Sequence, residues 1–182
     1  MAKNILVLTG SPRKGGNSDL LADAFITGAQ QSGHTVVKFE AAEKNIKGCR
    51  ACNTCFSKGT ACSFPDDFNE LVPLLEQADV IVFATPLYWF SFPTQLKAAI
   101  DKFYSFLIGK RQLKIKECIL LVCGVAEDEV EYDGIVRSYE LIADYQHWKE
   151  IGKIIVPGVN EKGDILKTNG LKRAEELGKS MF

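Results

Sequence analysis

Residues 5–8 read Ile-Leu-Val-Leu, and residues 10–18 read Gly-Ser-Pro-Arg-Lys-Gly-Gly-Asn-Ser. The apolar run predicts a buried strand, and apolar residues recur at helical spacing over residues 20–25. A polar, glycine-bearing loop between a strand and a helix faces the unpaired N–H groups and the positive dipole end of that helix. Because Arg13 adds a cation, this loop is a candidate cradle for a terminal phosphate. The simpler alternative is a turn in which Asn17 caps the helix.

Strands and helices alternate along the rest of the chain. The predicted strands are Ile5–Thr9, Thr35–Phe39, Asp79–Thr85, Glu117–Cys123 and Ile151–Val156. The predicted helices cover about Ser18–Ser32, 66–78, Thr94–Leu107, Ile135–His147 and Ile165–Lys179. This alternation predicts an α/β protein with a doubly wound parallel sheet. Since ligands on such sheets bind beyond the carboxyl ends of the strands, the loops 10–17, 86–92 and 124–133 are expected to form the site.

The composition is that of an ordinary globular protein, with 46% hydrophobic and 25% charged residues among 182. This length suits one domain over 1–182, with a cysteine-rich loop at about 43–65. A net charge of −1 gives no reason to expect nucleic acid or an anionic membrane as a partner. No apolar run is long enough to span a membrane, and there is no room for a signal peptide before the first strand. We therefore expect a cytoplasmic protein.

A second unusual loop follows the predicted strand at 79–85. It reads Pro86-Leu87-Tyr88-Trp89-Phe90-Ser91-Phe92-Pro93 and holds four aromatic residues. Such side chains stack on a flat ring, and the backbone between them can bond the edge of the ring. For the aromatic residues alone, packing on a neighbouring helix or subunit is an equal alternative. Since the Walker sequence and the Gly-x-Gly-x-x-Gly fingerprint are both absent, the two loops together favour flavin mononucleotide (FMN).

Four cysteines form the third signal, with the spacing Cys49-x2-Cys52-x2-Cys55-x6-Cys62. A disulfide framework is not expected in a reducing compartment. Four thiolates this close together can hold a [4Fe–4S] cluster. Free thiols that bind no iron and a structural zinc site are the two alternatives, although four-cysteine zinc sites usually pair two short hairpins.

The remaining cysteines and the histidines have more ordinary interpretations. Cys118 and Cys123 lie five residues apart in one strand, which places them on opposite faces as core residues. Cys123 stands at the carboxyl end of that strand, where it can touch the ligand. His34 is predicted to lie on the surface after the first helix, and His147 to end a later helix, where a cation suits the dipole.

Three segments carry a family resemblance: Gly10-Ser11-Pro12-Arg13, Asn17-Ser18 and Thr85-Pro86-Leu87-Tyr88-Trp89. They resemble the flavodoxin-like NAD(P)H-dependent FMN reductases, and the cysteine segment followed by Asp66-Asp67 is similar to their iron–sulfur flavoprotein branch. The resemblance implies a five-stranded sheet in the order 2-1-3-4-5 within three layers, and a homodimer or homotetramer. It also implies the residues that bind FMN: Ser11, Arg13, Gly16, Asn17 and Ser18 around the phosphate, Pro86, Leu87, Tyr88, Trp89 and Phe90 along the ring, and Gly124 on its other side.

Two redox functions follow from these signals. The first is an oxidoreductase that uses FMN to pass electrons from NAD(P)H to a quinone, a nitroaromatic compound, flavin or a similar small acceptor. No residue is expected to be catalytic in it, because the flavin does the chemistry. The alternative is an electron carrier that is reduced by ferredoxin through a [4Fe–4S] cluster on Cys49, Cys52, Cys55 and Cys62. A third hypothesis, a non-enzymatic zinc-binding module, explains neither of the two loops.

Overall fold

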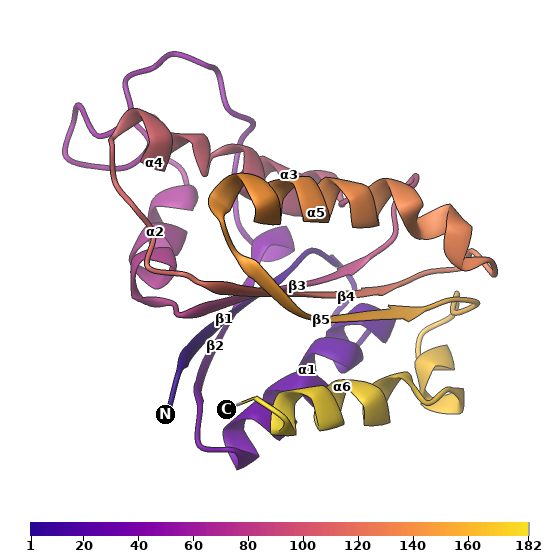
Figure 1. Cartoon of the computed structure of the whole chain (residues 1–182). Coiled ribbons are helices and arrows are strands. Elements are labelled where there is room, and N and C mark those ends of the chain that lie inside the picture. Colours follow the sequence, from indigo (N-terminus) through magenta and orange to yellow (C-terminus); the bar gives the residue numbers. More distant parts are fainter. Residues whose placement is uncertain (182) are drawn as a thin grey trace.

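A computed structural model describes residues 1–181 of the chain. Its five strands form one parallel sheet in the order β2-β1-β3-β4-β5 (Figure 1). The strands are β1 (Asn4–Thr9), β2 (Thr35–Glu40), β3 (Val80–Pro86), β4 (Glu117–Cys123) and β5 (Lys149–Val156). This order confirms the predicted flavodoxin-like sheet. Because the order reverses between β1 and β3, the crevice for a ligand is expected at their carboxyl ends.

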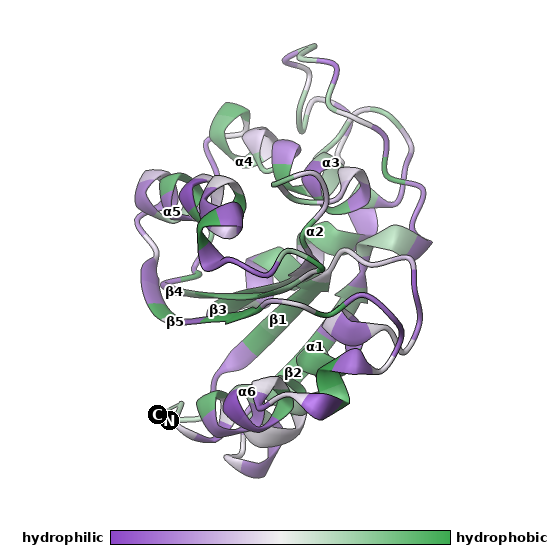
Figure 2. Ribbon diagram, turned by 90° about the vertical axis from the view of Figure 1, so that its right-hand side faces the viewer, coloured by the Kyte–Doolittle hydropathy of each residue, from purple (hydrophilic) through white to green (hydrophobic). Residues whose placement is uncertain are grey.

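Helices cover both faces of the sheet (Figure 1). One face carries α1 (Asn17–Gln31) and α6 (Gly170–Lys179), and the other carries α2 (Phe68–Gln77), α3 (Thr94–Asp101), α4 (Tyr104–Ile108) and α5 (Asp133–Gln146). Short 3-10 turns lie at Ala41–Glu43, Glu129–Tyr132 and Asp164–Lys167. Figure 2 shows the strands as the most hydrophobic layer, with hydrophilic residues on the outer sides of the helices. No helix within residues 1–181 is both long and apolar enough to cross a lipid bilayer.

Two glycines let α1 and α6 pack at very short range. A Cβ atom on Gly28 would lie 2.0 Å from the backbone oxygen of Glu175, and one on Gly178 would lie 2.3 Å from that of Phe25. Side chains at these positions would separate the two helices, so only glycine permits the approach. The first and the last helix are therefore held side by side under the sheet.

Two predicted helices are interrupted in the structure. The helix expected over 94–107 is divided into α3 and α4, because the chain forms tighter i→i−3 bonds at the junction, such as Lys102 N–H to Ala99 O at 3.1 Å. The helix expected from Ile165 begins only at Gly170, after a separate 3-10 turn. The first interruption matters for the site described below, since it directs Lys102 into the protein.

His34 is buried, so the prediction that it lies on the surface was wrong. The residue is 7% exposed. Its Nδ1 accepts a hydrogen bond from the backbone N–H of Lys3 at 3.1 Å, and its Nε2 lies 2.9 Å from the backbone oxygen of Met181. Because Nδ1 accepts, the ring proton belongs on Nε2, which donates to Met181. The imidazole thus joins the two ends of the chain, which lie close together in Figures 1 and 2.

Candidate functional site

A cavity of about 430 Å³ opens at the carboxyl ends of the strands. The loops after β1, β3, β4 and β5 all contribute to its wall. The lining residues are Ser11, Arg13, Gly16, Asn17, Ser18, Pro86, Leu87, Tyr88, Trp89, Cys123, Gly124, Val125, Val159 and Asn160. All residues predicted to bind FMN are therefore brought together here, except Phe90.

The amino end of α1 forms one wall of this cavity. The first intrahelical hydrogen bond of α1 joins Leu20 N–H to Gly16 O at 2.9 Å. The N–H groups of residues 17–19 come before this bond and have no acceptor within the helix. Arg13 lines the same wall, and no carboxylate within residues 1–181 forms an ion pair with it, whereas its neighbour Lys14 does form one. Phosphates bind where a helix dipole is positive, where backbone N–H groups have no intrahelical acceptor and where a cation has no ion pair. This wall combines the three features.

Asn17 holds a loop that the sequence analysis missed. Its side-chain amide makes three hydrogen bonds to backbone groups of residues 161–165, at 2.9, 3.1 and 3.3 Å. The N-cap of α1 is Gly16, so the alternative in which Asn17 caps the helix was wrong. Val159 and Asn160 at the start of that loop line the cavity. The rule that ligands bind at the carboxyl ends also covers the loop after β5, and could have predicted this wall.

The aromatic loop ends in a tight turn at the mouth of the cavity. Tyr88 and Ser91 exchange backbone hydrogen bonds at 3.1 and 3.0 Å, and Trp89 and Phe90 between them have φ angles of +46° and +65°. Two central residues in the left-handed region make a type I′ turn, which strains bulky side chains. Trp89 is 93% exposed and lines the cavity, while the ring of Phe90 packs edge-on against Trp89. The turn thus presents an indole ring to a ligand at the mouth.

The end of β4 closes the far side of the cavity. A Cβ atom on Gly124 would lie 3.0 Å from the Cβ of Leu87, so glycine keeps this wall thin. Cys123 is 2% exposed, and burial raises the pKa of its thiol to about 12. The thiol is therefore neutral at physiological pH. Cys118 lies in the hydrophobic core on the opposite face of the sheet, as predicted.

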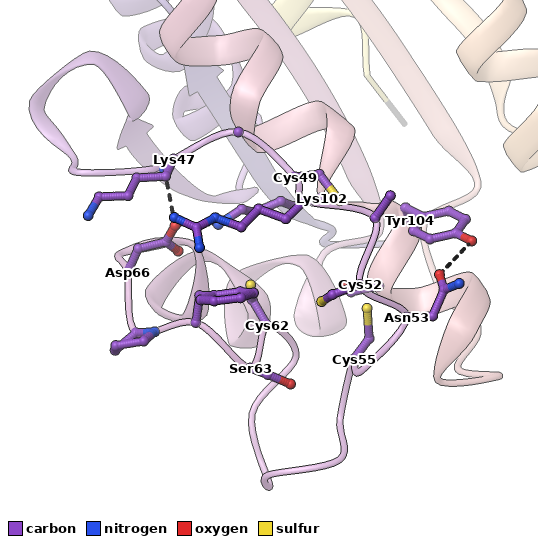
Figure 3. Close-up of a pocket in the computed structure, with 16 residues that line it drawn as sticks. Lys47, Cys49, Cys52, Asn53, Cys55, Cys62, Ser63, Asp66, Lys102 and Tyr104 are labelled. Carbon is purple, nitrogen blue, oxygen red and sulfur yellow. Dashed lines mark hydrogen bonds and ion pairs between the residues drawn. The ribbon is translucent and has the colours of Figure 1, made fainter.

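The four cysteines of the predicted metal site line a second cavity of about 130 Å³ (Figure 3). This cysteine cavity lies between the loop 47–66 and the beginning of α4. Left-handed φ angles of 50°, 55° and 59° at Ala51, Asn53 and Phe56 coil the loop so that the cysteines surround one space. Within residues 1–181, no three His, Cys, Asp or Glu side chains are close enough together to hold a single metal ion.

A buried ion pair lies on the wall of the cysteine cavity. The ammonium of Lys102 contacts the carboxylate of Asp66, and these side chains are 4% and 1% exposed. The same carboxylate accepts hydrogen bonds from the backbone N–H groups of Lys47 at 3.0 Å and Phe68 at 3.1 Å. Asp66 therefore joins both ends of the cysteine loop to the end of α3.

The sequence profile of the NADPH-dependent FMN reductases matches residues 3–133, a range that includes the loops after β1, β3 and β4. The chain belongs to this family. The protein is accordingly an NAD(P)H-dependent oxidoreductase with FMN as its cofactor, as the sequence analysis predicted.

Comparison with known proteins adds relatives that are iron–sulfur flavoproteins. One from Archaeoglobus fulgidus is 32% identical over 174 residues, which cover 94% of this chain and 75% of that protein. Another, from Methanocaldococcus jannaschii, is 26% identical over an alignment of 188 positions, gaps included, which covers 97% of this chain and 94% of that protein. The solved structure of the NAD(P)H:quinone oxidoreductase from Methanothermobacter marburgensis has a TM-score of 0.78 at 22% identity, over 98% of this chain and 96% of that one, which supports the fold. The predicted oligomer and the cytoplasmic location stay predictions.

The larger cavity has walls that fit FMN. Arg13 and the amino end of α1 offer a cation and N–H groups to the phosphate. The walls at Leu87, Gly124 and Val125 are uncharged, as the ring requires, and Trp89 can stack at the mouth. FMN, when bound, supplies the hydride and electron transfer chemistry.

The stability of the folded protein is expected to fall above pH 9, and Cys123→Ala is expected to make that fall smaller. The thiol has a pKa of about 12 in the folded protein and an ordinary value of 9.0. Between these values the unfolded chain loses the proton and the folded chain keeps it, so stability falls by up to about 1.4 kcal/mol per pH unit. Below pH 9 both states keep the proton and the thiol has no effect on the slope. Urea unfolding of both proteins from pH 7 to about pH 10.5 measures this, and identical pH profiles would contradict it.

Proposed function

We propose that this protein passes electrons from NAD(P)H to a small acceptor such as a quinone, a nitroaromatic compound or free flavin. The observation that carries this proposal is the chemistry of the cavity wall. Among its lining residues, Arg13 is the one with a permanent charge, and no histidine or carboxylate is present. Such a wall binds and orients a ring and excludes water, and leaves the chemistry to the cofactor. The exposed indole of Trp89 supports stacking of a flat second substrate at the mouth.

An anaerobic spectroscopic experiment tests this function. The FMN-loaded protein is expected to lose the yellow absorbance of oxidised flavin when NADPH or NADH is added, and to regain it when a quinone follows. Trp89→Ala is expected to slow both steps while FMN stays bound. Cys52→Ser, at the other cavity, is the matched control and is expected to change neither. Protein that keeps its absorbance with both nucleotides would exclude the proposal.

A second candidate is an electron carrier with a [4Fe–4S] cluster on Cys49, Cys52, Cys55 and Cys62. The favouring observation is that all four thiols line one cavity, which basic residues Lys47, Arg50 and Lys102 share. A [4Fe–4S] cluster is larger than a single metal ion, and each of its four thiolates binds a different iron. The four thiolates must therefore surround a space that holds the cluster. Four-cysteine zinc sites usually pair two short hairpins, whereas three of these cysteines lie within the single segment 49–55. The curated relatives named as iron–sulfur flavoproteins support the same choice.

Iron analysis separates the two candidates. Anaerobically purified protein is expected to contain about four irons per chain and to accept electrons from a reduced ferredoxin. The triple variant Cys49→Ser, Cys52→Ser, Cys55→Ser is expected to lose the iron and the reduction by ferredoxin, and to keep the reduction by NAD(P)H. Iron-free protein that reacts with ferredoxin as fast as iron-loaded protein would contradict a carrier role for the cluster.

A further inference from the structure

A carboxylate lies behind the loop 10–17, the phosphate loop of the larger cavity. Asp19 stands in the first turn of α1, directly after Ser18, which lines the cavity. Its Oδ2 accepts a hydrogen bond from the backbone N–H of Gly15 at 2.7 Å, and Gly15 is the neighbour of Gly16 on the cavity wall. Asp19 does not line the wall itself, and its side chain is 13% exposed. A negative charge this close to the place of a phosphate opposes phosphate binding unless another group compensates it.

Lys38 on β2 compensates this charge. Its Nζ lies 2.5 Å from Oδ1 of Asp19 and 2.7 Å from Oδ1 of Asp23. The side chain of Asp23 is 53% exposed, so water screens its charge, whereas the side chain of Lys38 is only 22% exposed. Burial lowers the pKa of the Lys38 ammonium, but its hydrogen bonds to both carboxylates outweigh burial and raise that pKa above the ordinary value. The ammonium therefore stays charged at physiological pH.

The pair of Lys38 and Asp19 also has a purely structural interpretation. It joins α1 to β2, which is an edge strand of the sheet, and lysine is common on edge strands because its charge discourages pairing with another chain. The contact with Gly15 points beyond this interpretation. The carboxylate that Lys38 neutralises holds the N–H of Gly15, whose φ angle of +61° turns the phosphate loop. The pair is therefore part of the structure that shapes the phosphate end of the cavity.

We propose that Lys38 sets the preference of this protein for FMN over riboflavin, because it neutralises Asp19 behind the phosphate loop. Without the ammonium, the Asp19 carboxylate repels the phosphate of FMN, whereas riboflavin, which has no phosphate, is unaffected. Lys38 does not line the cavity, so it is a positioning residue that acts through Asp19. The inference concerns the binding of the cofactor and does not depend on which acceptor receives the electrons.

Fluorescence titrations of the full chain, freed of bound flavin, test this role with FMN and with riboflavin. Lys38→Met removes the charge and keeps an unbranched side chain. It is expected to weaken FMN binding about threefold to tenfold and to leave riboflavin binding unchanged. The loss is expected to become smaller as the salt concentration is raised, because dissolved ions screen the repulsion.

A second substitution separates charge from structure. Adding Asp19→Asn to Lys38→Met is expected to restore the FMN affinity, since the amide oxygen can still accept from the Gly15 N–H and carries no charge. A residue that only joined α1 to β2 would not be rescued in this way. Asp23→Asn is the matched control, because it removes the exposed carboxylate beside Lys38 that has no contact with the phosphate loop, and it is expected to change neither affinity.

Three results would overturn the inference. The first is a Lys38→Met variant that binds FMN as the wild type does, or that loses FMN and riboflavin binding in equal proportion. The second is a double variant that does not recover the FMN affinity. The third applies if Lys38→Met does not fold: Asp19→Asn alone is then expected to bind FMN at least as tightly as the wild type, and weaker FMN binding by that variant would show that the carboxylate aids the phosphate instead of opposing it.

Discussion

Asp66→Ala is expected to lower the free energy of unfolding by about 3–5 kcal/mol. The substitution leaves the ammonium of Lys102 buried without a counter-ion, and that side chain is only 4% exposed. It also removes the acceptor for the N–H groups of Lys47 and Phe68, which hold both ends of the cysteine loop. The loop 47–66 is therefore expected to detach from α3 along with the loss of stability.

Urea unfolding of iron-free protein measures this effect, and Asp101→Ala is the matched control. Asp101 is one residue from Lys102 and pairs with Lys97 on the surface, where the side chains are 44% and 45% exposed. Such a pair contributes about 0.5 kcal/mol or less. The double variant Asp66→Ala, Lys102→Met is expected to recover much of the loss, since it removes the unpaired charge. If Asp66→Ala costs no more than Asp101→Ala, the buried pair does not hold the loop.

Arg13→Ala is expected to weaken FMN binding by roughly 10- to 100-fold. The guanidinium lines the phosphate end of the larger cavity and has no ion pair with any described residue, so its charge is available to the ligand. A hydrogen bond to a charged group contributes about 1.5–3 kcal/mol, which corresponds to that change in Kd. Riboflavin lacks the phosphate, so its affinity is expected to stay the same, and the preference for FMN over riboflavin should decrease.

Fluorescence titration with both flavins measures the two affinities. Lys14→Ala is the control, because it removes the neighbouring cation, which pairs with Glu43. This control is expected to change neither affinity. A loss of FMN and riboflavin binding in equal proportion would show that Arg13 supports the loop rather than the phosphate.

The parts of the fold that were predictable depend on local patterns. The residues of β3 from Val80 to Thr85 are all buried, and their continuous apolar sequence already indicated a strand covered on both faces. In a parallel sheet, the loops that follow such strands meet at one edge whatever their detailed conformation. For this reason the loops with Arg13, Trp89 and Gly124 were correctly expected to converge.

The parts that were missed depend on contacts between distant residues. Asn17 bonds to the loop 161–165, and His34 bonds to Lys3 and Met181, across up to 148 residues of sequence. Nothing in the surrounding sequence indicates which partner such a polar side chain will meet. The surrounding sequence likewise does not indicate the left-handed turn at Trp89 and Phe90, in which the two rings pack edge-on.

The order of apolar and polar residues by itself determined the parallel sheet, the edge at which the ligand binds and the four thiols that share a loop. These features follow from periodicity and spacing, which act over a few residues at a time. Only the tertiary structure decided that Asp66 pairs with Lys102 and that Asp19 pairs with Lys38. Burial and pairing depend on how α3 packs against the cysteine loop and how α1 packs against β2, and that packing is a property of the whole chain.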